Sequence, residues 1–201
     1  MTAGSSCLAC QPATLQTLVQ SQPALAALWQ ALPRRSFDAG AVLLRQADAS
    51  DRCWLLESGL VRFYYLSEAG VERNRSFHLA GSWVAGAMPP LSLPSPCTIE
   101  AVETTRVVEL PYAALHDWQR QFPQTQTLLD DALGYLFTQQ SRREAQLLTL
   151  SPEERYQRFL QTDGELAARL PMHQVASYLG ISHVSLSRMR ARLGMTPTRR
   201  G

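Results

Sequence analysis

The segment 171–193 constrains the fold of this chain more than any other, because its pattern predicts two short helices joined by a tight turn. Gly180 follows the first helix, at the point where a left-handed residue is needed to end it. Ser182 is a suitable cap for the second helix. This order of elements is that of a helix-turn-helix, whose second helix enters the major groove of DNA. The apolar positions that define the inner faces are Val175, Ala176, Leu179, Leu186, Met189 and Leu193.

The positive charge of the chain is concentrated at this end. Arg188, Arg190 and Arg192 lie on the second helix, and no Asp or Glu occurs from 171 to 201. The net charge of the whole chain is only +2, so the basic surface is local, as a nucleic-acid footprint requires. On the pattern alone, a plain helical hairpin with a solvated basic face remains an alternative.

Composition indicates a globular chain of one or two domains. The 201 residues are 45% hydrophobic and 18% charged, which is ordinary for a soluble protein. No apolar run approaches the length of a membrane span, and the N-terminus lacks the pattern of a secretory signal. We therefore expect a cytoplasmic protein with no membrane partner. Its four cysteines should then be thiols or ligands, and not structural disulfides.

The middle of the chain predicts an antiparallel β jelly roll. Short segments rich in β-branched and aromatic residues alternate with Asp, Ser, Gly and Pro clusters, and the turns 57–59 and 67–70 predict hairpins. Two short helices broken at Pro23 precede this region, and a proline-rich excursion at 89–96 interrupts it. The predicted strands are 41–45, 53–57, 60–66, 74–79, 98–102 and 106–110.

A helical half follows. A short helix is predicted over 112–121 and a long one over 124–150, where apolar positions repeat with alternating steps of four and three. That spacing is a heptad seam and predicts a homodimer; the alternative is that the helix packs back on the β unit. Ser151 and Glu154 form a capping-box pattern that begins the next helix, 152–161. The predicted seam residues are Leu129, Leu133, Leu136, Gln140, Arg143 and Leu147.

The fold class is therefore α+β: an N-terminal antiparallel jelly roll, a long dimerisation helix and a C-terminal all-α helix-turn-helix domain. We expect the domains at 1–123, 124–150 and 151–201. This order resembles the Crp/Fnr family of bacterial transcription regulators, which are not enzymes. The resemblance implies a cyclic-nucleotide-binding-like roll that senses an effector, and a homodimer that binds double-stranded DNA and contacts RNA polymerase. It is carried by the segments 77–84, 99–104 and 175–188.

Two departures from the family concern the effector. Cyclic-AMP-binding members have a Gly-Glu pair and an Arg-Ser pair around the nucleotide, whereas this chain has 85–87 (Ala-Gly-Ala) and 95–96 (Ser-Pro) at the comparable positions. Without the Arg, a buried cyclic phosphate has no cationic partner, so we expect no usual cyclic-nucleotide binding. Two alternatives remain: the roll binds an unknown small-molecule effector, or it serves only as a dimer scaffold. The candidate pocket residues are Trp83, Ala85, Gly86, Ser95, Cys97 and Thr98.

Cys7 and Cys10 are the candidate redox residues. Their spacing is that of two iron–sulfur ligands in oxygen-sensing members of the family, but a third nearby cysteine is absent and Val108 stands at the position of the β-roll ligand. The pattern therefore does not favour a cluster. A redox- or iron–sulfur-sensing regulator, a thiol switch and inert thiols remain alternatives. No other group of residues has metal-ligand spacing.

The resemblance also implies the DNA contacts. Arg188 is the best candidate for a bidentate contact to guanine, and Val184 stands where many members have a Glu that accepts from cytosine. The short spacer after 150 suggests a compact subgroup with a short or missing wing. The base-facing candidates are His183, Val184, Ser187, Arg188 and Arg192, and the phosphate-contact candidates are His173, Gln174, Ser185 and Arg190.

An enzyme is not indicated. His78 is alone in the β region, and neither a His-x-His pair nor a Ser-His-Asp or Cys-His arrangement occurs. The remaining alternative is a ligand-binding module that has lost DNA recognition.

Overall fold

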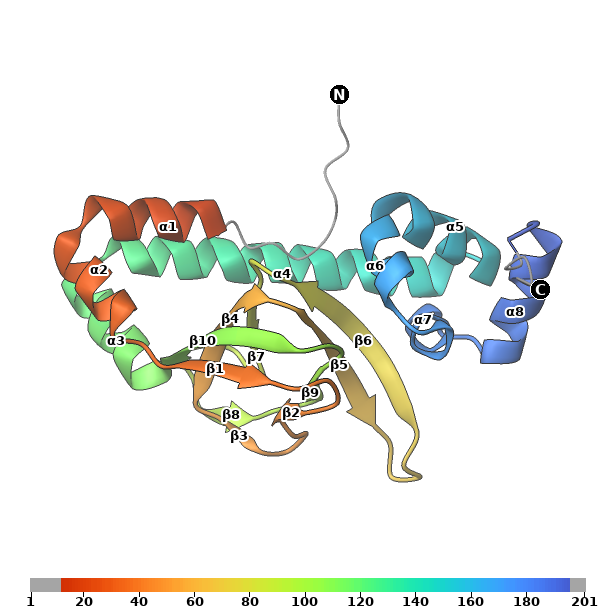
Figure 1. Ribbon diagram of the computed structural model, residues 1–201, viewed down its shortest axis with the longest axis horizontal. Coiled ribbons are helices and arrows are strands. Elements are labelled where there is room, and N and C mark those ends of the chain that lie inside the picture. Colours follow the sequence, from red (N-terminus) through yellow and green to blue (C-terminus); the bar gives the residue numbers. More distant parts are fainter. Residues whose placement is uncertain (1–11, 196–201) are drawn as a thin grey trace.

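The computed structural model describes residues 12–195, and of residues 12–16 the backbone alone. Figure 1 shows the long helix α4 (Gln124–Thr149) spanning the molecule above a β roll, with helices α1–α3 at one end and α5–α8 at the other. In the described part of the chain, no helix combines the length and the apolar character that a membrane span requires.

The N-terminal helices are α1 (Pro12–Ser21) and α2 (Pro23–Gln30), and the predicted break at Pro23 is confirmed. Pro23 occupies the first turn of α2, where its missing N–H has no intrahelical partner to lose. Leu25 of this helix is fully buried against the roll.

The jelly roll is confirmed: every strand pair is antiparallel. The described strands form two four-stranded sheets, in the orders β1-β10-β4-β7 and β2-β9-β5-β6, with a small third sheet of β3 and β8. The strands are β1 (Arg34–Phe37), β2 (Val42–Leu44), β3 (Ala49–Ser50), β4 (Arg52–Ser58), β5 (Leu60–Leu66), β6 (Glu72–Leu79), β7 (Trp83–Ala85), β8 (Leu93–Pro94), β9 (Thr98–Ala101) and β10 (Thr105–Pro111).

One predicted hairpin is confirmed and one is wrong. The turn 67–70 joins the paired strands β5 and β6, and Gly70 N donates to Ser67 O at 2.9 Å. The turn 57–59 instead connects β4 and β5, which belong to different sheets. Gly59 has a φ of +96°, and a side chain there would lie 2.6 Å from the Thr105 Cα, so the chain can cross between the sheets only at a glycine.

The alternation of residues along β4 places side chains in two different cores. Trp54 and Leu56 point between the sheets, into a cluster with Ile99. Cys53 and Leu55 point outward, beneath α1–α3. Since both faces of this sheet are covered, β4 is buried along most of its length, a pattern that central strands show.

The helical half has the predicted elements. The capping box is confirmed: Ser151 Oγ accepts from Glu154 N at 3.3 Å, and Ser151 N donates to Glu154 Oε2 at 2.7 Å. The helices are α3 (Tyr112–Gln121), α5 (Pro152–Thr162), α6 (Gly164–Arg169), α7 (Met172–Leu179) and α8 (His183–Arg192).

Helix α7 packs directly on strand β6 of the roll. Asn74 connects the two: its backbone N donates to Ser177 Oγ at 2.9 Å and its Nδ2 donates to the Gln174 carbonyl at 3.0 Å. Phe77 of β6 lies edge-on to Tyr178 of α7, with ring centroids 5.5 Å apart. The helix-turn-helix unit (residues 152–192) and the roll therefore meet across a packed interface.

Candidate nucleic-acid interface and internal pocket

The α7–α8 turn has the geometry that the sequence predicts. Gly180 has a φ of +71°, in the left-handed region, and its N donates to Ser177 O. Ser182 Oγ accepts from Ser185 N at 3.1 Å and thereby caps α8. Leu186 and Met189 of α8 are buried in the same cluster as α7, so the two helices are held at a fixed angle.

The outer face of α8 is open. His183, Val184, Ser185, Ser187 and Arg188 are exposed, and Val184 retains 57% of its accessible surface, a large fraction for an aliphatic side chain. Among the residues that the structure describes, Arg188 forms no ion pair. An unpaired guanidinium beside an exposed valine and two hydroxyls is chemically suited to the edges of bases in a groove.

The other two arginines of α8 are engaged within the chain. Arg190 Nη1 donates to the Tyr156 hydroxyl at 2.7 Å, and its Nη2 donates to Met195 O at 3.0 Å. Arg192 forms an exposed ion pair with Glu153 at 3.3 Å. The structure therefore gives Arg190 a role in fixing α8 on α5, and does not support it as a phosphate contact; Arg192 stays accessible.

The two candidates on α7 have opposite surroundings. His173 is exposed, whereas Gln174 is buried because α7 lies against β6. The Gln174 carbonyl accepts from Asn74, and its side-chain oxygen is buried without a hydrogen-bond partner in the structure. The expected phosphate contact of Gln174 is therefore not available in this arrangement.

The residues of the predicted dimer seam face their own chain. Leu129 packs beside α3, and Leu133 and Leu136 line a cavity against the roll. Gln140 accepts from Arg75 of β6 when its amide oxygen is turned toward the guanidinium, and Arg143 donates to the Tyr178 carbonyl. Only Leu147 is exposed, at 43%. The alternative expectation, that α4 packs back on the β unit, is what the structure shows for this stripe.

The interior of the roll is filled with side chains. Ser95, Cys97 and Thr98 are buried. A Cβ placed on Gly86 would lie 2.2 Å from Leu44 Cδ2 and 2.7 Å from Ser95 Oγ, so no room remains beside this glycine. Ser95, Cys97 and Thr98, three of the predicted pocket residues, therefore do not line the cavity described below. In this structure the space around these residues is filled by side chains, among them Leu44 beside Gly86.

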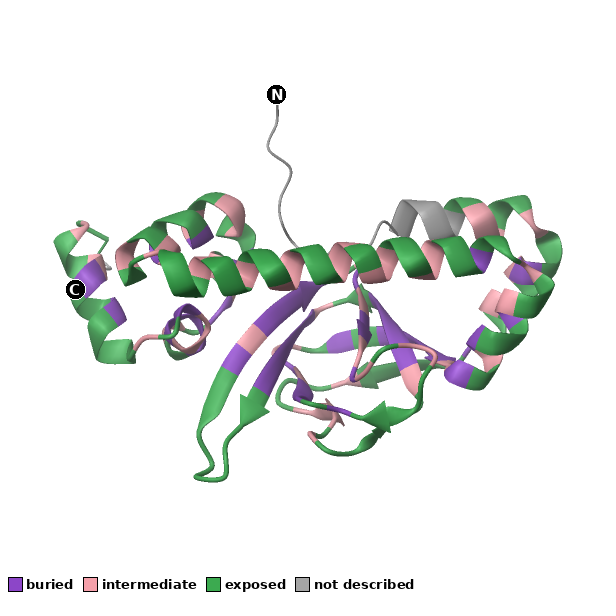
Figure 2. Cartoon of the chain, turned by 180° about the vertical axis from the view of Figure 1, so that it is seen from behind, coloured by how far each residue is buried: buried purple, intermediate pink, exposed green. Residues whose placement is uncertain are grey.

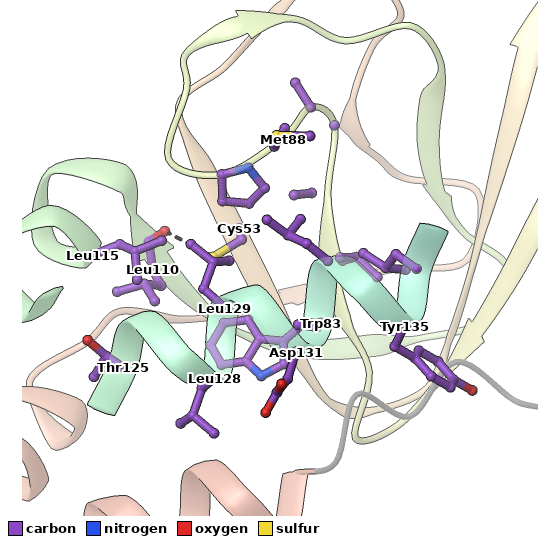
Figure 3. Close-up of a pocket in the computed structure, with 18 of the residues that line it drawn as sticks. Cys53, Trp83, Met88, Leu110, Leu115, Thr125, Leu128, Leu129, Asp131 and Tyr135 are labelled. Atoms are coloured by element: carbon purple, nitrogen blue, oxygen red, sulfur yellow. Dashed lines mark hydrogen bonds between the residues drawn. The ribbon is translucent and has the colours of Figure 1, made fainter. Parts of the chain in front are cut away.

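A cavity lies between α4, α3, the edge strand β7 and the loop that follows it, and Arg75 of β6 also lines it (Figure 3). Its volume is about 650 Å³, within the range of small-molecule sites. Three predicted pocket residues, Trp83, Ala85 and Gly86, line it. The other lining residues are Cys53, Arg75, Val84, Ala87, Met88, Pro89, Pro96, Leu110, Leu115, Trp118, Thr125, Leu128, Leu129, Asp131, Ala132, Leu133, Tyr135 and Leu136.

Sequence reasoning missed the part of this cavity that α4 contributes. The apolar spacing of the stripe 129–136 predicts a covered helix face but does not tell which surface covers it. The same spacing therefore also fits a dimer seam. Arg75 was also missed, since a single basic residue on a strand carries no pattern. The available signal was the pair of Trp83 and Trp118, two large apolar side chains that α3 and β7 bring to the same cavity.

Burial shifts the pKa values of two titratable groups of the roll, His78 and Cys53. Burial lowers the pKa of His78 to about 3, and the charge of Arg75 adds to this effect. Its Nε2 lies 2.9 Å from Ser76 Oγ. Burial raises the pKa of the Cys53 thiol to about 12, and no group of three or more potential metal ligands occurs in residues 12–195. Cys7 and Cys10 lie outside the described residues.

Comparisons with known proteins find a cyclic nucleotide-binding domain and similar bacterial regulatory proteins. The model of the cyclic nucleotide-binding domain matches residues 34–122. The transcriptional activator protein Anr of Pseudomonas protegens is 28% identical over 173 residues, which cover 79% of this chain and 69% of Anr. The anaerobic regulatory protein of Haemophilus influenzae is 26% identical over 165 residues, covering 75% of this chain and 63% of that protein.

Among solved structures, FixK2 from Bradyrhizobium japonicum has the same fold. The TM-score is 0.72 at 20% sequence identity, and the match covers 82% of this chain and 85% of FixK2. At this identity the likeness is one of architecture: a roll, a long helix and a terminal helical unit in the same order.

Proposed function

The chain belongs to the Crp/Fnr family of transcription regulators, and we propose that it binds a specific DNA site as a homodimer under the control of its β roll. The observation that carries this proposal is the open face of α8, which a capped turn holds in place and on which Arg188 has no ion-pair partner in the described chain. In this role the protein acts by binding and not by catalysis, in the cytoplasm, with RNA polymerase as a further partner.

The chemistry of the open face suggests which contacts specify the site. Arg188 is the candidate for the two acceptors of guanine in the major groove. Val184 offers only an apolar contact, suited to a thymine methyl group. Ser185 and His173 are exposed near the two helix starts, where hydroxyl and imidazole groups can position the unit on phosphates.

The dimer contact in this proposal is the outer face of α4. Phe137 and Leu148 are exposed at 74% and 77%, unusual values for large apolar residues. Figure 2 shows exposed positions recurring along this helix on the side turned away from the roll. With Gly134, Ser141 and Ala145 they form one stripe, here called the outer stripe, whose small members allow two helices to approach closely.

The effector is proposed to be something other than a cyclic nucleotide held in the usual way. The position of the missing phosphate-binding Arg is occupied by buried Ser95, and Leu44 fills the space beside Gly86. The cavity beneath α4 has a mostly apolar wall.

Arg188→Ala tests the proposal. A preferred DNA sequence is first selected from a genomic fragment library with the purified protein. We then expect the variant to lose discrimination against scrambled DNA by about 5- to 150-fold in a gel-shift titration, the range for one bidentate base contact. Dimerisation should be unchanged.

The matched control is Arg158→Ala, which removes the same charge from an exposed position on α5. It should leave discrimination intact. Full discrimination by the Arg188 variant would refute the assignment of Arg188. Binding of the wild-type protein that does not weaken steeply with salt would refute DNA recognition itself, because phosphate contacts release counterions.

A further inference from the structure

We propose that the cavity beneath α4 binds an organic acid: an apolar, preferably aromatic body whose carboxylate, or a comparable anionic group, pairs with Arg75. This inference rests on the proposed function, since it names the class of effector that the regulator would sense.

The wall of the cavity selects for an apolar body. Trp83 from β7, Trp118 from α3 and Leu129 and Leu133 of α4 line it, together with Met88 from the loop that follows β7; Figure 3 labels Trp83, Leu129 and Met88. A site of about 650 Å³ enclosed by such side chains gains free energy mainly by removing apolar surface from water.

Arg75 supplies the charge that selects the head group. It is half-buried and lines the cavity, yet no acidic side chain in residues 12–195 forms an ion pair with it. Its contacts are the Gln140 amide, the Cys97 Sγ at 3.6 Å and the face of Phe63 at 5.8 Å. All of these are weaker partners for a guanidinium than a carboxylate.

Arg62 on the neighbouring strand β5 provides a comparison, because its guanidinium forms ion pairs within the chain. Arg62 of β5 is also buried, and it pairs with Glu72 at 2.7 Å and with Glu100 at 2.9 Å. Arg75 has no such pairing although it lies in the same sheet. A partly buried cation without a counter-ion is costly, so its place at a cavity wall points to an anion that comes from outside the chain.

A second charged residue defines the orientation of the ligand. Asp131 lies at the other end of the cavity, on α4. Asp131 and Gln140 are nine residues apart on α4, which separates them by roughly 14 Å along the helix axis, and Gln140 is the residue that contacts Arg75. An acid group is therefore attracted to the Arg75 end and repelled from the Asp131 end.

Strand β6 links the cavity to the helix-turn-helix unit. Arg75 donates to Gln140 of α4, and the preceding residue, Asn74, holds α7. A carboxylate that takes the guanidinium donors displaces Gln140. Loading of the cavity thereby changes the contact between β6 and α4 next to the residue that positions α7.

The test compares three probes that share one apolar body and differ in the head group: 2-naphthoate, 2-naphthol and 2-naphthalenemethylamine. Isothermal titration calorimetry of the full chain should give 2-naphthoate the lowest Kd, by about tenfold or more, as expected for a charge-assisted pair. Arg75→Gln should reduce its affinity to that of 2-naphthol and leave 2-naphthol unchanged.

Two further variants make the result decisive. Arg73→Gln removes an equal charge from an exposed position on the same strand and should change nothing. Ala132→Trp fills the cavity from α4 and should abolish binding of all three probes. Circular dichroism verifies that each variant is folded.

The inference is overturned if 2-naphthoate and 2-naphthol bind equally to the wild-type chain, if Arg75→Gln keeps the preference, or if none of the probes binds at millimolar concentration. Gel shifts on the same samples separate this from the proposed function. Retained DNA recognition without a preference for the acid refutes only the effector class, and the acid preference without DNA recognition refutes only the regulator.

Discussion

Two polar residues of β6, His78 and Arg75, have contrasting surroundings: one is enclosed in the roll and the other lines a cavity. His78 and Arg75 both lie on β6, three residues apart. His78 is enclosed by the roll, lies 4.6 Å from the Phe63 ring and bonds to Ser76. It is a neutral core residue, as its isolation in the sequence suggested, whereas Arg75 lines the cavity beneath α4.

The burial of His78 predicts that acid destabilises the protein. Its pKa is about 3 in the folded chain, below the ordinary value of 6.5, so between these values the unfolded chain binds a proton that the folded chain does not. The free energy of unfolding should therefore fall as the pH drops below about 6.5, by about 2 kcal/mol at pH 5 relative to pH 7.5. Urea titrations at both pH values measure this difference.

His78→Gln should lose that pH dependence, because Gln keeps a hydrogen-bonding group beside Ser76 but does not titrate. The exposed His116 provides the control, and His116→Gln should behave like the wild type. Equal pH profiles for the His78 variant and the wild type would show that another group governs the acid sensitivity.

At the scale of elements, the sequence predicted what its periodicity and turn residues encode. The bounds of α3 and β5, and the break at Pro23, follow from the spacing of apolar residues and from proline. β1, β3, β7 and β8 were not predicted, since a polar segment and strands of two or three residues show no alternation. The length of α4 was predicted closely, but its orientation was not, because a seven-residue repeat does not say which of two surfaces covers it.

Phe137→Glu should dissociate the proposed dimer, because a carboxylate placed in the outer stripe would be buried against its copy without a partner. Sedimentation velocity at micromolar concentration should show the monomer for this variant and the dimer for the wild type. The control is Thr138→Glu, one residue further and roughly 100° around the same helix. A dimer that persists with Glu at position 137 would place the contact on another face.

At the scale of the whole molecule, the order of the parts followed from the sequence and their docking did not. The contact between Asn74 and Ser177 joins residues 103 positions apart through polar atoms, and hydrophobic periodicity carries no information about such a pair. The same holds for the cavity, whose wall is assembled from the strands β4, β6, β7 and β10, the loop after β7 and the helices α3 and α4. By contrast, the exposed candidates for DNA contact on α8 could be predicted, because they belong to one local sequence motif.

Asn74→Ala should loosen this docking. The variant removes the Nδ2 group that donates to the buried Gln174 carbonyl and the Oδ1 atom that accepts from Arg62, a loss of roughly 1–3 kcal/mol in the free energy of unfolding. Amide hydrogen exchange in α7 should become faster, while exchange in β4 should follow only the global change. Arg73→Ala, at the exposed neighbouring position, should leave α7 protected. Unchanged protection of α7 in the Asn74 variant would mean that apolar packing alone holds the unit.

The apolar cluster around α7 has a consequence for the modularity of the protein. Leu60, Phe77 and Leu79 come from the roll, yet they lie in one cluster with Phe159 and Leu179 of the helical unit. The chain therefore has no clean boundary at which one half could be exchanged for that of a relative. A chimaera that takes its DNA-binding half from another protein must also inherit the matching surface of β5 and β6, or repair it, before the two halves can fold as one cooperative structure.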